Sequence, residues 1–319
     1  YRDRLLALYD AHPDFVVPAS RFNEIRRLVA DGLEDFSISR VKEKMPWGVA
    51  VPNDPDHVMY VWFEALVNYI STLGWPDDNA AFSMFWPGVQ IAGKDNLRQQ
   101  SAMWQAMLMS AGLPNSAQIL IHGFITVDGQ KMSKTVGNVI DPFAFVEKYG
   151  TDPVRYYLLR EIPSGEDGDF SYKKFEERYN GDLANGLGNL VARIAALGIK
   201  AGTFLKLEYD QQFLLVSDLA GIKLRYEKNI NNFRLNEALG NVWELIGRMD
   251  KWVNDQKPWT NNATELKAFM ETAAHGLQEI AFMLEPFLPE TAEKIRAQIA
   301  IEDSAIRIKK GEHLFPRLS

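Results

Sequence analysis

Residues 118–142 of the chain read QILIHGFITVDGQKMSKTVGNVIDP. The apolar run at 118–127 predicts a buried strand, and the glycine-flanked residues 128–138 predict a loop. Asp141 followed by Pro142 is typical of a capped helix start. The aspartate accepts from free backbone N–H groups of the first turn, and proline has no N–H that would need an acceptor. A strand, a loop and a helix in this order favour an α/β fold with a parallel sheet.

The same alternation of strand and helix extends to both sides of this stretch. Asp152 and Pro153 predict a second capped helix start, and Gly112 with Pro114 predicts a helix end. The predicted upstream segments are an extended piece (47–52), a buried strand (57–65), a helix (68–73), a second buried strand (85–92) and a helix (95–110).

Beyond Gly168 the pattern changes from strands to long helices. Apolar residues recur at steps of three and four between Leu235 and Trp252, which predicts an amphipathic helix with one wide buried stripe. Residues 266–287 repeat this pattern. We therefore predict an α/β half with a parallel sheet, followed over residues 170–319 by an all-α helical bundle.

Composition narrows the class of protein. The chain has 319 residues, a net charge of −7, five histidines and no cysteine. The lack of cysteine excludes disulfides and thiolate zinc sites and suits a cytoplasmic location, and the scattered histidines lead us to expect no bound metal. Indiscriminate coating of nucleic acid is excluded, since it depends on lysine and arginine. No apolar run approaches the roughly 20 residues that cross a bilayer.

Two lysines three residues apart, Lys131 and Lys134, lie in the predicted loop. Alone they are compatible with a solvated turn, but the flanking glycines let the loop move, and mobile lysines can close over a polyphosphate. The loop resembles the KMSKS signature of class I aminoacyl-tRNA synthetases, with Thr135 in place of the final serine. The resemblance implies that Lys131, Ser133 and Lys134 steady the triphosphate of ATP, which carries Mg²⁺, while an amino acid carboxylate attacks the α-phosphorus.

Three further blocks resemble the methionyl branch of that class. They are YVWFEALVNY at 60–69, AGKDNLR at 92–98 and HGF at 122–124. The resemblance implies a methionine pocket built from Trp62, Ala65 and Tyr69, and aromatic faces beside a small residue suit an unbranched, polarizable thioether. The alternative is that these aromatic residues only fill the core. Gln99 and Gln100 stand where relatives often carry an aromatic residue and a histidine, so contact between Gln100 and methionine is an open prediction.

The same resemblance implies a nucleotide site. Asp95 would hold the substrate ammonium or the ATP ribose, and its alternative role is to cap a helix. His122 and Gly123 would lie beside the adenine, and Trp104 either packs under the nucleotide or belongs to the core. Arg40 resembles an arginine that supports catalysis, and its alternative is a surface salt bridge.

A polar stripe on the predicted helix 182–197 suggests contact with RNA. Asn185, Asn189 and Arg193 are spaced four residues apart, so they share one face of that helix. Asparagine and arginine can read splayed-out bases, and Trp259, which follows a proline, would offer a stacking surface. The resemblance implies that these four residues read the anticodon. The alternatives are a solvated helix face and a hydrophobic plug.

The resemblance also divides the chain. It implies the end of a connecting insertion at 1–45, the second half of a Rossmann-type catalytic domain at 46–169 and an anticodon-binding bundle at 170–319. Because the first residue is Tyr1, we expect a longer gene product whose upstream part carries the HIGH motif and a zinc insertion. The predicted function is part of a methionine–tRNA ligase that binds methionine, ATP and tRNA(Met), and this segment alone is expected to be inactive. A synthetase for another hydrophobic amino acid and a non-catalytic tRNA-binding module are the alternatives.

Overall fold

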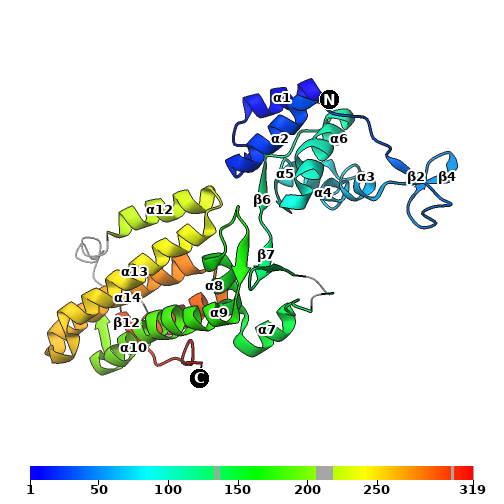
Figure 1. The fold of residues 1–319 in the computed structure, drawn as a ribbon. Coiled ribbons are helices and arrows are strands. Elements are labelled where there is room, and N and C mark those ends of the chain that lie inside the picture. Colours follow the sequence, from blue (N-terminus) through cyan, green and yellow to red (C-terminus); the bar gives the residue numbers. More distant parts are fainter. Residues whose placement is uncertain (133–134, 136, 206–217, 303–304, 319) are drawn as a thin grey trace. The chain divides into compact units, whose positions relative to one another are not determined.

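The computed structural model describes residues 1–132, 135, 137–205, 218–302 and 305–318. They form two compact units, Tyr1–Phe124 and Ile125–Ser319 (Figure 1). The boundary between the units falls inside the predicted segment 46–169, so the predicted domain boundaries do not coincide with it and stay predictions. None of the helices in the described part of the chain has both the length and the apolar character needed to cross a membrane.

A three-stranded parallel sheet forms the centre of the first unit. Its order is β1 (Val16–Val17), β6 (Gln118–His122) and β5 (Val89–Gly93), and it lies against α1 (Arg2–Ala11) and α2 (Ala19–Asp31). The core between sheet and helices is apolar and contains Leu5, Tyr9, Ile25, Ile119 and Ile121. The prediction of an α/β fold with a parallel sheet is confirmed.

The predicted buried strand at 57–65 is wrong. A small antiparallel sheet, β2 (Ser39–Val41), β4 (Asp54–Met59) and β3 (Ala50–Val51), ends at Met59, and two short helices follow, α3 (Val61–Ala65) and α4 (Asn68–Ser71). The apolar residues beyond Met59 pack across helical turns rather than on a sheet face: Leu66 and Ile70, four residues apart, are both buried. A short apolar run fits either geometry, which is why the sequence pattern misled us.

The predicted strand at 85–92 is also too early. Helix α5 (Asn79–Phe85) occupies its beginning, and Asp78 caps that helix by accepting from the N–H groups of Ala80 and Ala81. Strand β5 begins only at Val89, and its side chains alternate between two faces: Val89 and Ile91 are exposed, whereas Gln90 and Ala92 are buried.

The predicted helix at 95–110 is confirmed with an irregular start. It passes through the 3₁₀ turn η1 (Lys94–Asn96) and the π-helical η2 (Gln99–Met103) into α6 (Trp104–Ala111). Gly112 ends it in the left-handed conformation, with φ +71°, which favours glycine.

The predicted strand at 118–127 is divided between the units. Strand β6 ends at His122, and β7 (Ile125–Val127) belongs to a second sheet, between β8 (Gln130–Lys131) and β9 (Gly168–Phe170). Asp141 caps α7 (Pro142–Tyr149) as predicted, since its carboxylate accepts from Phe143 N at 2.9 Å.

Asp152 does not cap a helix of its own, so that prediction is wrong. Gly150 occupies the N-cap position of helix α8 (Thr151–Glu161), without a side-chain capping hydrogen bond, and Asp152 lies buried inside the first turn. Its Oδ2 instead accepts from Thr291 N at 2.6 Å, at the start of α15 (Pro289–Ala297). Burial decides the outcome, because a buried carboxylate needs a donor and the free N–H groups of another helix supply one.

The remainder of the second unit is mainly helical. Its elements are α9 (Tyr172–Arg178), the π-helix η3 (Tyr179–Gly188), α10 (Asn189–Ala201), α12 (Leu219–Asn231), α13 (Leu235–Gln256), the 3₁₀ turn η4 (Pro258–Thr260) and α14 (Ala263–Leu284). The predicted apolar stripe of α13 is confirmed: Ala238, Leu239, Val242, Leu245, Ile246 and Met249 are all buried.

One feature of this unit was not predicted. A three-stranded antiparallel sheet, β10 (Thr203–Leu205), β12 (Ala305–Ile308) and β11 (Ile299–Glu302), adds to the bundle, so the expectation of an all-α second half needs that correction. Each strand has only three or four residues, too few for an alternating pattern to stand out.

Candidate functional site

The carboxyl ends of β5 and β6 bring together two of the predicted site residues, Asp95 and His122. Gly93 and His122 are paired at the ends of these adjacent parallel strands. A Cβ placed on Gly93 would lie 2.8 Å from Asp95 Oδ1 and 3.7 Å from His122 Cε1, so both side chains border the same glycine. In open α/β sheets, ligands bind at the carboxyl ends of the strands. Because Gly93 has no side chain, a ligand can approach its backbone closely here and also contact the Asp95 carboxylate.

The two polar side chains at this position are open to solvent. Asp95 and His122 are both exposed, whereas Gly123 is buried. His122 Nδ1 lies 2.8 Å from the Gly123 carbonyl. When Nδ1 carries the proton it donates to that carbonyl, and Nε2 is then left as an acceptor. A carboxylate and an imidazole acceptor can together bind an ammonium, a hydroxyl or an exocyclic amine.

The predicted methionine pocket lies on α3, α4 and η2. Trp62 and Tyr69 both pack at the margin of an aromatic cluster. The Tyr69 hydroxyl accepts from Gln100 Nε2 at 2.8 Å, and its ring lies 6.1 Å from that of Trp104. Ala65 is exposed. The structure thus brings Trp62, Tyr69 and Gln100 into one neighbourhood, where Gln100 orients the tyrosine.

Trp104 belongs to the core, as one of the two alternatives held. Only 1% of it is exposed, and its ring packs 6.1 and 6.2 Å from those of Tyr69 and Trp86. The indole N–H has no hydrogen-bond partner among the described residues. Trp104 also borders a cavity of the first unit, and its contact with ATP stays a prediction.

An open cavity of about 840 Å³ lies in the first unit. Its lining includes Phe36, Arg40, Tyr60, Gln99, Trp104 and Met107. Arg40 donates to the carbonyls of Ser37 and Ser39 at 2.9 and 2.8 Å, and its guanidinium stacks 4.1 Å from the Tyr60 ring centroid. Within the described residues it makes no salt bridge, so the alternative of a surface ion pair is not supported. Carbonyls and an aromatic face instead hold this cation at the cavity.

The lysine loop begins at a hairpin in the second unit. Asp128 and Gly129 form its turn, with φ +49° and +75°. Asp169 anchors the hairpin, since its Oδ1 accepts from Thr126 Oγ1 at 2.6 Å and from Gly129 N at 2.7 Å. These hydrogen bonds lower the pKa of Asp169. Sequence reasoning missed this aspartate, which is far from the loop along the chain.

The predicted phosphate-binding residues are only partly described. Lys131 is exposed at the end of β8, while Ser133 and Lys134 lie outside the described residues. Lys131 belongs to the second unit, whereas Asp95 and His122 belong to the first. The approach of the lysine loop to the nucleotide site therefore stays a prediction.

The predicted RNA-facing residues lie at the junction of η3 and α10. Asn185 and Asn189 are exposed, and Arg193 is half-buried. The predicted regular helix is π-helical up to Gly188, so the step from Asn185 to Asn189 crosses a change of helix type. Asn185 Oδ1 accepts from Arg317 Nε at 2.8 Å. Trp259, in the 3₁₀ turn η4, is 50% exposed, which does not fit a hydrophobic plug.

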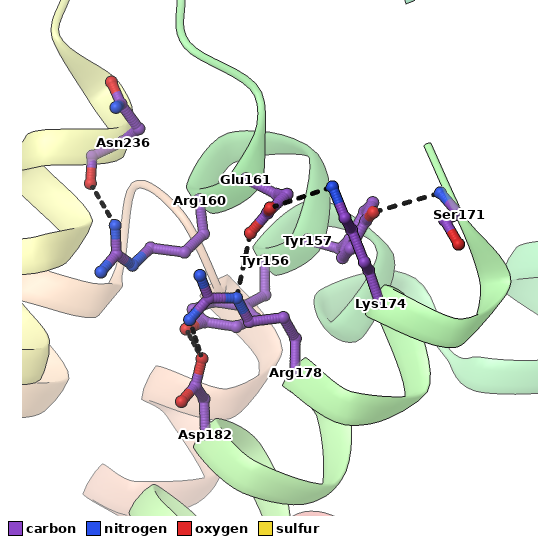
Figure 2. Close-up of polar contacts among 9 residues, drawn as sticks. All are labelled: Tyr156, Tyr157, Arg160, Glu161, Ser171, Lys174, Arg178, Asp182 and Asn236. Atoms are coloured by element: carbon purple, nitrogen blue, oxygen red, sulfur yellow. Dashed lines mark hydrogen bonds and ion pairs between the residues drawn. The ribbon is translucent and has the colours of Figure 1, made fainter. Parts of the chain in front are cut away.

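A polar network joins α8 to the start of η3, as Figure 2 shows. Asp182 Oδ2 accepts from the Tyr156 hydroxyl at 2.7 Å and from Arg178 at 3.1 Å, and Arg178 Nε donates to Glu161 at 3.0 Å. Burial and the neighbouring Asp182 raise the pKa of Tyr156. The network fixes the orientation of η3. Its only sequence signal is the four-residue spacing of Arg178 and Asp182, which an ordinary exposed pair would share.

Among the described residues, no group of three or more histidine, aspartate or glutamate side chains could hold a metal ion. Comparison with known proteins identifies the relatives of this chain.

Residues 1–195 match the family model described as tRNA synthetases class I (M). The methionine–tRNA ligase of Thermotoga maritima is 41% identical over 98% of this chain and 50% of its own length, and that of Clostridium acetobutylicum is 39% identical over 100% and 53%. The chain spans about half the length of these curated relatives.

Solved structures agree with this assignment. Mycobacterium tuberculosis methionyl-tRNA synthetase in complex with methionyl-adenylate is similar with a TM-score of 0.91 and 37% identity, over 99% of this chain and 67% of that one. Its apo form gives a TM-score of 0.88 and 34% identity, over 100% and 67%. The resemblance noted in the sequence is confirmed, and the chain belongs to the class I (M) family of tRNA synthetases.

Proposed function

We propose that this chain is part of a methionine–tRNA ligase. The reaction joins the methionine carboxylate to the α-phosphorus of ATP with release of pyrophosphate, and then transfers the methionyl group to tRNA(Met). The observation that carries the proposal is the meeting of Asp95 and His122 beside Gly93 at the ends of two parallel strands. Mg²⁺ would accompany the ATP phosphates, and the cytoplasm, where translation takes place, is the proposed location.

The first unit supplies the groups for amino acid and nucleotide. The Asp95 carboxylate binds the methionine ammonium or the ribose, and His122 and the Gly123 backbone lie beside the adenine. Trp62 and Tyr69 form the walls of the side-chain pocket, where each sulfur–aromatic contact is worth about 0.3 to 1.5 kcal/mol. Small Ala65 leaves room for the thioether. Gln100 acts on methionine through Tyr69, whose hydroxyl it holds by a hydrogen bond.

The second unit supplies phosphate binding and RNA binding. The triphosphate is steadied by Lys131, Ser133 and Lys134. Arg40 of the first unit, which is held in place by a backbone carbonyl and the Tyr60 ring, supports the reacting groups. The RNA face consists of Asn185, Asn189, Arg193 and Trp259, which read the anticodon. We propose three segments by comparison with the family. Residues 1–45 are the end of a connecting insertion, residues 46–169 are the second half of the catalytic domain, and residues 170–319 are the anticodon-binding bundle.

The test is ATP–pyrophosphate exchange by the full-length protein, with each hydrophobic amino acid offered in turn. We expect exchange that depends on methionine. In Asp95→Asn the exchange rate should fall by about 10- to 150-fold, since hydrogen bonds to charged groups are worth about 1.5 to 3 kcal/mol. Asp77→Asn, at another exposed aspartate of the first unit, is the matched control. Preference for a different amino acid would contradict the substrate. Absence of any exchange, with tRNA binding kept, would favour a non-catalytic module.

A further inference from the structure

Arg193 is held by two residues that no sequence pattern singled out. Its Nη1 donates to Asp250 Oδ1 at 2.8 Å, and its Nη2 donates to Asn254 Oδ1 at 2.6 Å. Asn254 Nδ2 in turn donates to Asp250 Oδ2 at 3.1 Å, which closes a ring of three hydrogen bonds. Asp250 and Asn254 lie four residues apart on α13, so they share a face of that helix.

This arrangement fixes the plane of the guanidinium. An arginine side chain has large rotamer freedom, and ordering it on binding RNA can lower affinity by roughly 30-fold. A single exposed ion pair would attract the charge without fixing its orientation. Here the two terminal nitrogens are each bound from a different side chain of α13. The side chain of Arg193 is therefore ordered before any ligand arrives.

The same contacts leave part of the arginine open to a ligand. Arginine has five N–H donors, and two of them are used within the described residues. The side chain is 28% exposed, and exposed Asn189 lies one helical turn away. Asp250 also neutralises the positive charge of Arg193. What remains is a set of directed donors without net charge, which suits base edges better than phosphates.

We propose that Asp250 and Asn254 are positioning residues for RNA recognition. They hold Arg193 so that it reads a base, and Asp250 suppresses attraction to the RNA backbone. The inference rests on the proposed function of the bundle as an anticodon reader. It goes further by assigning the choice between base and phosphate contact to residues on a second helix.

The test uses the full-length protein and two RNA stem-loops, one with the methionine anticodon CAU and one with a changed anticodon. Dissociation constants are measured by fluorescence anisotropy at several salt concentrations. We expect Asp250→Asn to lower the preference for CAU by about 10- to 30-fold and to steepen the salt dependence by about 0.7 in log–log slope, the value for one added phosphate contact. Asn254→Ala should lower the preference without steepening the salt dependence.

Asp255→Asn is the matched control. Asp255 lies on the same helix and pairs at 2.7 Å with Lys251, where both side chains are largely exposed. We expect no change in preference or in salt dependence for this variant. Unchanged preference in both Asp250→Asn and Asn254→Ala would overturn the inference, and so would an unchanged salt slope in Asp250→Asn.

Arg193→Ala separates failure of this inference from failure of the proposed function. If Arg193→Ala abolishes the preference while the Asp250 and Asn254 variants keep it, only the positioning role is overturned. If the unmodified protein shows no preference for CAU, the anticodon-reading function and the inference are overturned together. Melting temperatures of all variants are recorded, and a loss of preference supports the inference only where the melting temperature stays within a few degrees of the parent.

Discussion

Replacing Trp259 by leucine should weaken binding of the CAU stem-loop by roughly 5- to 150-fold. The range follows from about 1 to 3 kcal/mol for stacking one base on an aromatic ring. The indole is 50% exposed at the end of α13, and no aromatic ring of the described residues packs against it. One ring face is therefore available for a base. Leucine fills the buried half of the space but cannot stack.

The cost to folding should be smaller than the cost to binding. A fully buried tryptophan removes about 150 to 250 Å² of surface from water, so the half-buried Trp259 contributes about 2 to 3 kcal/mol, of which leucine keeps a large part. Trp252 provides the contrast, because its ring stacks on Phe269 at 4.3 Å and an interplanar angle of 5°. Trp252→Leu should lower the melting temperature more than Trp259→Leu and leave the anticodon preference unchanged.

Fluorescence anisotropy with the CAU and changed-anticodon stem-loops measures the first effect, and thermal unfolding measures the second. Two results would contradict a stacking role for Trp259. One is full RNA affinity in Trp259→Leu. The other is an equal loss of anticodon preference in Trp252→Leu, which would mean that the bundle loses its RNA contact through general destabilisation.

Three further predictions follow from other contacts. Asp152→Ala should lower the free energy of unfolding by about 1 to 3 kcal/mol in urea titration, because it leaves the buried Thr291 N–H without an acceptor; an unchanged midpoint would refute the capping role. Asp169 has a lowered pKa, so its stabilisation is present above the ordinary value of 3.8 and is lost as pH falls below it. Below that pH, the melting temperature of the parent should thus fall more steeply with decreasing pH than that of Asp169→Asn. Parallel curves of melting temperature against pH would contradict this. Lys134→Ala in the full-length protein should slow adenylate formation by about 3 to 4 kcal/mol in barrier with little change in melting temperature, and an unchanged rate would remove the loop from the mechanism.

Local signals in the sequence were reliable where a short segment determines its own structure. The cap at Asp141, the end of a helix at Gly112 and the apolar stripe of α13 depend on neighbours within a few residues, and all three are confirmed. The meeting of Asp95 and His122 follows from the parallel pairing of their strands, which the alternation of elements already indicated.

Features that depend on distant partners could not be predicted in this way. Asp152 looked like a local cap but binds Thr291 N, 139 positions away along the chain. The segment after Met59 is helical rather than extended because Leu66 and Ile70, one helical turn apart, are buried in a cluster that also contains Trp104 and Leu108 of α6. The partner residues Asp250 and Asn254 carry no motif, since an acidic or amide side chain on an exposed helix face is ordinary until its neighbour is known.

We propose that the lysine loop and the Asp95 site act on the same bound adenylate. The most direct measurement is a crystal structure of the full-length protein with a non-hydrolysable analogue of methionyl-adenylate. We predict that the adenosine contacts Asp95, His122 and Gly123, that the thioether lies against Trp62 and Tyr69, and that the loop from Lys131 reaches toward the phosphate. An analogue bound elsewhere, or a lysine loop on the opposite side of the molecule from Asp95, would contradict the account.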